Sequence, residues 1–344
     1  MAPVLEVAGL SVHLRTRRGP VHAVDDVSFS VGEREALAIV GESGSGKSVT
    51  SRSIVGLFPQ RVVHRRSGQV RFLGEDMLTA SENRLSSIRG RHIGMVFQDP
   101  MSSLNPVVRV GSQVAEPLRR HLGMSRAEAY ARAVELLEEV RIPDASQRVN
   151  SYPHEFSGGM RQRALIAAAT ACRPKLLIAD EPTTALDVTV EAEILSLLKN
   201  LQSEHGMALI LVSHDLNVVS NVADTVAVMY AGQIVEFAPA DELFARPEHP
   251  YTAGLLGSIP SIEKRHSLVR RERLTTIPGA PPNAASLPST CRFAERCLYA
   301  TSESVCRSTM PALREIRPGH WVRSAHPASE RASISGGPPV GQNP

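Results

Sequence analysis

A glycine-rich stretch carries residue types suited to holding phosphate. Its letters, GESGSGKS, fit the pattern G-x-x-x-x-G-K-[S/T] at every fixed position. Glycine permits backbone angles that side chains forbid, so successive N–H groups can point inward around an anion. The lysine would neutralise the outer phosphates, and the last hydroxyl would bind a magnesium ion. The residues expected at this phosphate site are Gly41, Glu42, Ser43, Gly44, Ser45, Gly46, Lys47 and Ser48.

Two carboxylates, Asp180 and Glu181, follow directly after the apolar residues 176–179. Carboxylates at the end of a buried strand are costly unless something pairs with them, and a magnesium–nucleotide complex is such a partner. We expect Asp180 to hold the metal through water, and Glu181 to orient and deprotonate the attacking water. By themselves the two would be read as an exposed acidic turn, but the phosphate loop favours the catalytic interpretation.

A second candidate anion site begins at Ser157. This serine is a good N-cap, and Gly158 and Gly159 open a helix that contains Gln162 and continues through Ala164 to Ala171. Free N–H groups at such a helix start attract phosphate. The alternative is a simple helix cap, which would be preferred in a chain without a phosphate loop.

Two single polar residues complete the candidate site. Gln98 follows the apolar residues 93–97, and His214 follows Ser213 at the end of another apolar run. Either could be a plain strand terminus. Ligands of doubly wound sheets, however, bind at the carboxyl ends of the strands. We therefore expect Gln98 and His214 to lie at the same sheet edge as Lys47 and Asp180.

The elements around these residues alternate between strand and helix, which indicates an α/β fold with a largely parallel sheet. A turn is expected at Arg18-Gly19-Pro20, and residues 226–229 and 233–236 are expected to form a hairpin. Helices are predicted over residues 49–55 and 190–201. Strands are predicted over residues 4–7, 28–31, 36–40, 69–74, 93–97, 176–179 and 208–212.

Residues 99–159 read as a mainly helical subdomain inserted into the α/β core. Ser125 and Glu128 form a capping-box pattern within it. The apolar stripe expected to face the core is Ala127, Tyr130, Val134 and Leu137. Beyond residue 237 the composition changes, so the predicted domains are 1–236, 237–326 and a disordered tail over 327–344.

Composition narrows the class of protein. The 344 residues are 42% hydrophobic and 21% charged, with a net charge of +3, as expected for one large globular domain with an appendage. The arginines are scattered without interleaved aromatic residues, so we expect no nucleic-acid partner. Neither a secretory signal nor an apolar run long enough to span a bilayer is visible, so a membrane role would depend on partner proteins.

The order of the motifs resembles that of ATP-binding cassette (ABC) ATPases. GESGSGKS is followed by Gln98, SGGMRQR, LLIADE, then Ala185-Leu186-Asp187 and Ser213-His214-Asp215. Six motifs in this order are highly specific. Four further runs resemble the oligopeptide/dipeptide (nickel/peptide) importer ATPases, and the resemblance extends from Val4 to about His326. These runs are QDPMSSLNP, YPHEFS, HPYT and IPGAPP.

The resemblance implies a P-loop NTPase nucleotide-binding domain. Its parts would be a RecA-like core sheet, an antiparallel β-subdomain, a helical subdomain and a small C-terminal extension. Cassettes of this family work as pairs, so the segment from Ser157 to Gln162 would serve the partner's nucleotide. Gln98 would sense magnesium and the attacking water, His214 would contact the γ-phosphate, and Asp187 would act across the dimer interface.

The implied cofactors are ATP and Mg2+. The implied partners are a second, nonidentical ABC ATPase subunit, two membrane permeases and, indirectly, an extracytoplasmic substrate-binding protein. The chain would bind peripherally at the cytoplasmic face of the cell membrane. Family substrates include oligopeptides, dipeptides, glutathione and nickel complexes, and the sequence does not encode the choice among them. Relatives stack an aromatic residue on adenine where this chain has Leu14, so His13 or His22 are alternatives.

Three cysteines, Cys291, Cys297 and Cys306, resemble a C-terminal cluster that ligates a [4Fe–4S] centre in some family members. The region where a fourth cysteine is expected offers Ser324. A cluster-free or three-cysteine site is therefore favoured over an intact cluster. Zinc held by the thiolates with His320 or His326 is a further alternative. The remaining cysteine, Cys172, reads as a buried small hydrophobe.

Four other functions fit the sequence less well. Fewer than sixty residues separate Gln98 from Ser157, which leaves no room for the long coiled coil of chromosome-type ATPases. Translation factors of this class carry two cassettes in one chain, and this chain has one. An exporter would carry fused membrane spans. A redox sensor built on the cysteines lacks the fourth thiol.

Overall fold

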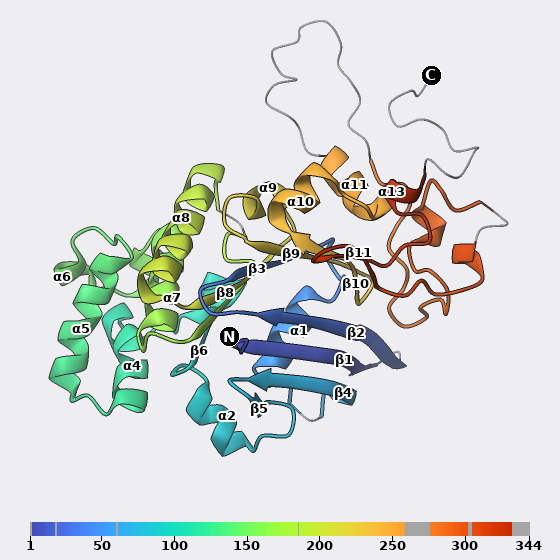
Figure 1. Ribbon diagram of the computed structural model, residues 1–344. Helices are drawn as coiled ribbons and strands as arrows, with labels where there is room; N and C mark the ends of the chain where they lie inside the picture. The colour runs from blue at the N-terminus through green and yellow to red at the C-terminus, as the bar shows by residue number, and fades with distance from the viewer. Residues whose placement is uncertain are drawn as a thin grey trace, which may run out of the picture.

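An eight-stranded sheet forms the centre of the computed structural model (Figure 1). The structure describes residues 2–17, 19–59, 61–184, 186–258, 276–301 and 305–331. The expectations for Arg18, Ala185 and residues 332–344 therefore lie outside the described residues. The strand order is β11-β12-β10-β9-β3-β8-β7-β6. The five strands from β9 to β6 are parallel, as the alternating pattern predicted.

The parallel strands are buried on both faces. Every residue of β3 (Ala36–Val40), β7 (Leu176–Asp180) and β8 (Ala208–Ser213) is buried. Alternate residues enter two different cores, because successive side chains of a strand point to opposite faces. Ala38 and Leu177 pack in a core with the helices, whereas Ile39 and Ile178 pack against the antiparallel sheet and α1. The remaining strands of this sheet are β6 (Ile93–Val96), β9 (Thr225–Tyr230) and β10 (Gln233–Pro239).

A second, antiparallel sheet has the order β2-β1-β4-β5. Its strands are longer than predicted, because β1 (Leu5–Thr16) and β2 (Gly19–Val31) form one continuous hairpin. The turn prediction is wrong at Gly19 and Pro20, which belong to β2 and pair with Thr16 and Arg15. The other two strands are β4 (Val63–Phe72) and β5 (Glu75–Asp76). Helices α1 (Lys47–Ile54) and α2 (Glu82–Ile88) complete this part of the molecule.

Helices dominate the segment predicted to be helical. They are α3 (Pro100–Ser103), α4 (Val110–Leu122), α5 (Arg126–Glu139), α6 (Ala145–Arg148), the 3-10 turn η1 (Pro153–Glu155) and α7 (Gly158–Thr170). The capping box of Ser125 and Glu128 is confirmed at the start of α5. The predicted stripe is wrong at Ala127, which is exposed. Ala129, Ala133, Leu136 and Leu137 are the buried ones, because they share the side of α5 that faces the core, whereas Ala127 lies on another side of the helix.

The C-terminal region continues the central sheet. Strand β12 (His320–Val322) pairs with β10, so Glu236 lies opposite Val322, and β11 (Arg314–Arg317) adds the last strand. Residues 328–331, predicted to be disordered, form the short helix α13 (Ala328–Arg331), because Glu248 accepts hydrogen bonds from Ser329. The other helices are α8 (Val188–His205), α9 (Leu216–Val219), α10 (Ala240–Ala245) and α11 (Pro250–Gly257), with 3-10 turns η2 (Ala294–Arg296) and η3 (Val305–Arg307).

Candidate active site

The phosphate loop lies between β3 and α1, as predicted, and its glycines cannot be replaced without strain. Gly41, Gly44 and Gly46 have φ angles of 152°, 81° and 105°. A Cβ atom on Gly41 would lie 2.1 Å from the Met229 carbonyl oxygen, and one on Gly46 would lie 2.4 Å from the Ala23 carbonyl oxygen. The loop can therefore pack against the backbone at Met229 and Ala23 only because Gly41 and Gly46 have no side chains.

Lys47 is the buried cation of this loop. Its side chain is 3% exposed, and its Nζ donates to the carbonyl oxygens of Gly41 at 2.7 Å and Glu42 at 3.0 Å. Burial lowers the pKa of Lys47, and the Glu181 carboxylate, 3.8 Å away, opposes that shift. An ammonium group held by two loop carbonyls is positioned to exchange them for the oxygens of a phosphate.

Ser48 and Asp180 form a pair of hard oxygen donors. The Ser48 hydroxyl donates to Asp180 Oδ1 at 2.8 Å. The other carboxylate oxygen is buried and has no hydrogen-bond partner among the described residues, and its nearest cation is Arg52 Nε at 3.7 Å. Burial raises the pKa of Asp180, because removal from water destabilises the charged form of a carboxylate. A hydroxyl and an unsatisfied carboxylate oxygen fit Mg2+, which prefers oxygen ligands.

Glu181 is the point at which the predicted residues meet. It follows β7 with a φ of 48°, an uncommon angle for a residue with a side chain. Its Oε2 accepts a hydrogen bond from Gln98 Nε2 at 2.7 Å and lies 3.8 Å from His214 Nδ1. Thr184, which the sequence analysis missed, donates to the same oxygen at 3.2 Å. The ends of β6, β7 and β8 thus bring their polar residues to one edge of the sheet, beside Lys47.

The segment at Ser157 has a different setting. Ser157 caps α7 by accepting a hydrogen bond from the Met160 N–H at 3.3 Å, and both Ser157 and Gly158 are exposed. Asp187 is likewise an exposed cap, at the start of α8. Gln162 does not share this surface. It is completely buried, and its amide has no hydrogen-bond partner within the part of the chain that the structure describes.

The C-terminal cysteines do not supply the donor set of a four-cysteine cluster. Cys291 donates its backbone N–H to the Cys306 carbonyl oxygen at 3.1 Å, and burial raises the pKa of the Cys291 thiol to about 11. Ser324 donates no thiolate, and its hydroxyl accepts the His326 N–H at 3.0 Å. A [4Fe–4S] centre therefore does not fit these residues. For the zinc alternative, His326 Nε2 lies 3.8 Å from Cys306 Sγ, whereas His320 is bound to Glu236 at 2.8 Å instead.

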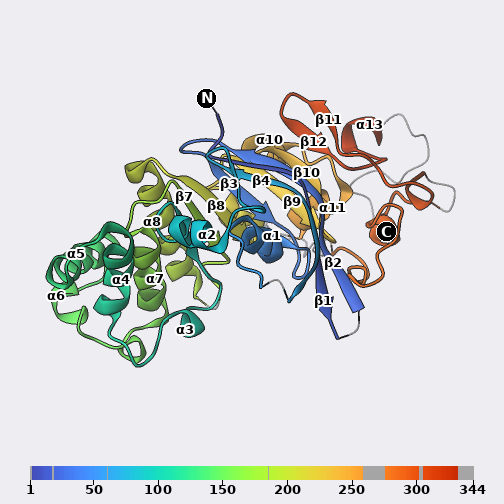
Figure 2. The same cartoon turned by 90° about the horizontal axis from the view of Figure 1, so that it is seen from below.

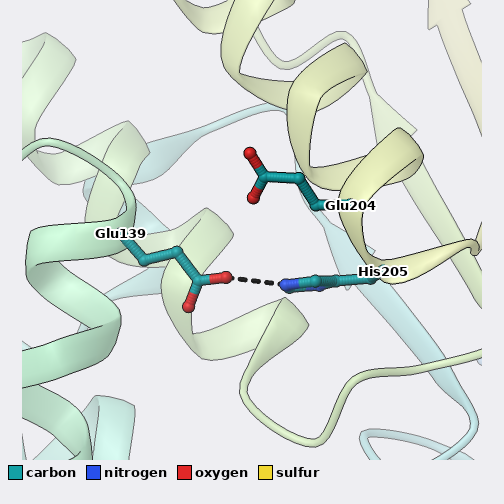
Figure 3. A group of neighbouring side chains, drawn as sticks. All are labelled: Glu139, Glu204 and His205. Carbon is teal, nitrogen blue, oxygen red and sulfur yellow. Dashed lines mark hydrogen bonds and ion pairs between the residues drawn. The ribbon is translucent and has the colours of Figure 1, made fainter.

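A different group of possible metal ligands consists of Glu139, Glu204 and His205 (Figure 3). His205 Nε2 contacts Glu139 Oε1 at 2.6 Å and thereby links the end of α8 to the end of α5. The second Glu139 oxygen faces Arg132 at 3.7 Å, and Glu204 is exposed. The half-buried Glu139 carboxylate is thus shared between Arg132 and His205, and the group links α5 to α8.

His13 and His22, the two residues considered for contact with the adenine ring, lie next to each other. The rings of His13 and His22 stack with centroids 3.9 Å apart. His22 also lines a small pocket with phosphate-loop residues and with Pro281, Pro282 and Ala284 of the C-terminal region. No spacing rule in the sequence brings a segment 240 residues away to the phosphate loop, so the sequence analysis missed it.

Comparison with known proteins agrees with this geometry. The family model "ABC transporter" matches residues 24–184, and "Oligopeptide/dipeptide transporter, C-terminal region" matches residues 235–306. A Brucella abortus (strain 2308) protein named "Putative peptide import ATP-binding protein" is 54% identical over 304 residues, covering 88% of this chain and 90% of that protein. A protein of the same description from Brucella melitensis is 51% identical over 327 residues, covering 93% and 96%.

Solved structures resemble the same part of the chain. The dimeric ATP-binding cassette MJ0796, in a post-hydrolysis state with ADP and Pi, matches with a TM-score of 0.62 and 28% identity, covering 69% of this chain and 98% of that one. CbiO1 from Clostridium perfringens matches with a TM-score of 0.60 and 27% identity, covering 71% and 92%. The fold and site thus define an ABC-type ATPase. The chain belongs to the ATP-binding subunits of ABC transporters that carry the oligopeptide/dipeptide transporter C-terminal region.

Proposed function

We propose that this chain hydrolyses ATP at a site shared with a second cassette and thereby drives the uptake of peptides through membrane permeases. The observation that carries the proposal is the meeting of Gln98, Lys47 and His214 around Glu181. The similarity to proteins named for peptide import supports the substrate class.

Each residue of the site has a proposed task. The loop N–H groups and Lys47 bind the phosphates of ATP, and Glu181 accepts a proton from the attacking water. The hydrogen bond from Gln98 orients Glu181 toward that water, and His214 contacts the γ-phosphate. Ser48 and Asp180 would hold Mg2+, which supplies charge neutralisation at the phosphates when bound.

The second half of the site would come from another cassette. The surface of Ser157, Gly158, Gly159 and Asp187 would contact the partner's nucleotide, and the partner's equivalent surface would contact ATP at Lys47. The exposure of Ser157, Gly158 and Asp187 at two helix starts supports this role, because helix starts attract anions. The matching MJ0796 structure is a dimer. Gln162 is left out of this surface because of its burial.

The partners and location follow from the class. We propose two membrane permeases, a nonidentical companion ATPase and peripheral binding at the cytoplasmic face of the membrane, with substrates delivered by an extracytoplasmic binding protein. The loop that follows Gln98 would receive a coupling helix of a permease. Within the described residues, no helix combines the length and the apolar character that crossing a bilayer requires.

A pull-down tests this function. Tagged chain is purified from detergent-solubilised membranes, and its ATPase rate is measured with and without oligopeptides and dipeptides. Co-purified permeases and peptide-stimulated hydrolysis are expected. A partnerless ATPase that is stimulated by DNA or ribosomes would overturn the importer function and leave only the nucleotide site.

A further inference from the structure

The C-terminal region folds back onto the phosphate loop. The Ala284 carbonyl oxygen accepts a hydrogen bond from the His22 N–H at 3.1 Å, and Pro281 and Pro282 line a pocket together with Glu42 and Ser43. Figure 2 shows this region, coloured orange to red, alongside β10 and the end of β2. A segment outside the ABC transporter match thus borders the residues that bind phosphate.

Arg296 makes the strongest of these contacts. Its guanidinium donates in a bidentate manner to the carboxylate of Glu42, the second residue of the phosphate loop, at 2.7 and 2.9 Å. The Arg296 side chain is only 5% exposed. Its Nε donates to the Pro278 carbonyl oxygen at 2.8 Å, which orients the two terminal nitrogens toward Glu42. Bidentate arginine–carboxylate pairs are among the strongest hydrogen-bonded contacts in proteins.

Glu42 is therefore held at three points. Arg296 binds its side chain, and the hydroxyl of the buried Tyr251, on α11, accepts its backbone N–H at 2.8 Å. Its carbonyl oxygen accepts the Lys47 ammonium at 3.0 Å. Glu42 is thus held by Arg296 and Tyr251 from outside the phosphate loop and by Lys47 from within it.

A second arginine repeats this arrangement. Arg292 donates to the Ala231 carbonyl oxygen at 2.6 Å and pairs with Asp25. Its side chain is 7% exposed. Both arginines lie on the short stretch from Cys291 to Cys297, so this stretch is attached to the nucleotide-binding core at two places.

We infer that Arg296, together with Tyr251, is a positioning residue for ATP: the C-terminal region holds the phosphate loop in its binding conformation by clamping Glu42. This inference rests on ATP binding at the loop, as proposed above. Two physical effects follow. A loop ordered before binding loses less conformational entropy when ATP arrives. A neutralised Glu42 also repels the incoming phosphates less than an unpaired carboxylate would.

The inference predicts a specific kinetic pattern. Within the part of the chain that the structure describes, the Arg296 side chain bonds to Pro278, Glu42 and Tyr230 and not to Glu181, Gln98 or His214, so it influences ATP binding and not the chemical step. Arg296→Ala should raise the KM and the Kd for ATP on the order of tenfold, the loss expected for a charged hydrogen bond. Its kcat at saturating ATP should stay within about twofold of the wild-type value.

A matched control exists in the same region. Arg307 forms an ion pair with Glu295 at 2.8 Å on the exposed surface, away from the phosphate loop. Arg307→Ala should leave the KM for ATP unchanged. Hydrogen exchange at residues 42–45, measured without nucleotide, should accelerate in Arg296→Ala and not in Arg307→Ala. If Arg296→Ala fails to fold, Arg296→Lys takes its place, because it keeps the charge, loses the bidentate geometry and should give a smaller rise of KM.

A double-mutant cycle tests the partner residue. In a Glu42→Gln background the carboxylate is gone, so Arg296→Ala should raise KM by clearly less than it does in the wild type. Equal ATP affinities for Arg296→Ala, Arg307→Ala and the wild type would overturn the inference while leaving the ATPase function intact. A wild-type chain that binds no ATP would instead overturn the proposed function itself.

Discussion

Two parts of the proposed nucleotide site differ in how many of their contacts lie within this chain. The first half surrounds Glu181, and the second half contains Ser157 and Asp187. Around Glu181, side chains from three strand ends contact one another, and Lys47 is 97% buried. Around Ser157 and Asp187, the polar groups are exposed and make only the hydrogen bonds of ordinary helix caps. The first half is assembled within one chain, whereas the second exposes the groups that we propose to contact the nucleotide of a partner cassette.

This difference has a physical origin. Parallel strands carry their carboxyl ends to one edge, so β6, β7 and β8 assemble the first half as soon as the sheet forms. The second half lies on two helix starts, where Ser157 and Asp187 each accept one backbone N–H and the exposed backbone faces solvent. Changes in the first half should therefore act on one chain alone, and changes in the second half should act only on the assembled pair.

The largest expected effect is that of Glu181→Gln. Without the general base, hydrolysis should fall by about 10²- to 10⁴-fold, while ATP remains bound. Phosphate release and bound nucleotide are measured on the same preparation. Wild-type turnover in this variant would remove Glu181 from its role as the base.

Ser157→Arg tests the exposed half. A bulky cation on this surface should block hydrolysis by the assembled complex, because it obstructs the contact with the partner's nucleotide. ATP binding by the isolated chain, measured by calorimetry, should not change. Loss of binding by the monomer would show that Ser157 belongs to its own chain's site and would end the distinction between the two halves.

Lys47→Ala should weaken ATP binding by roughly ten- to a hundredfold, the cost of losing a charged hydrogen-bond donor at the phosphates. Calorimetric titration with ATP measures the change. Lys175 is not part of the loop and serves as the control position. Unchanged affinity after Lys47→Ala would exclude this lysine from the phosphate site.

The smallest expected effect belongs to the helical segment. Ser125→Ala removes the cap of α5, which should lower the free energy of unfolding by about 1 kcal/mol. ATP affinity should stay at the wild-type value, because α5 has no residue in the Glu181 site. Denaturant unfolding and an ATP titration check both expectations. A parallel loss of affinity would mean that the two parts of the fold are coupled more tightly than their contacts indicate.

Local patterns predicted the first half of the site well. The phosphate loop and the ends of β6, β7 and β8 follow from short motifs and from the geometry of a parallel sheet. Spacing alone misplaced Ala127, because the apolar stripe read from the sequence is rotated away from the face of α5 that packs in the core. Gln162 belongs to a signature motif, yet its position on α7 faces the core, which only tertiary packing decides.

The contact between Arg296 and Glu42 was beyond sequence reasoning. The two residues are 254 positions apart. Their meeting depends on how the segment that precedes β11 and β12 folds back onto the phosphate loop, where Pro278 holds Arg296. Neither residue type is unusual where it stands in the sequence, so no local signal marks the pair.

The most direct test of the shared site is the specific ATPase activity of the wild-type chain over a wide range of protein concentration, with and without the companion cassette that co-purifies with it. A site completed by two chains predicts activity that rises with concentration, or on addition of the companion, and then saturates. Constant specific activity from the dilute monomer, equal to that of the assembled complex, would contradict the account.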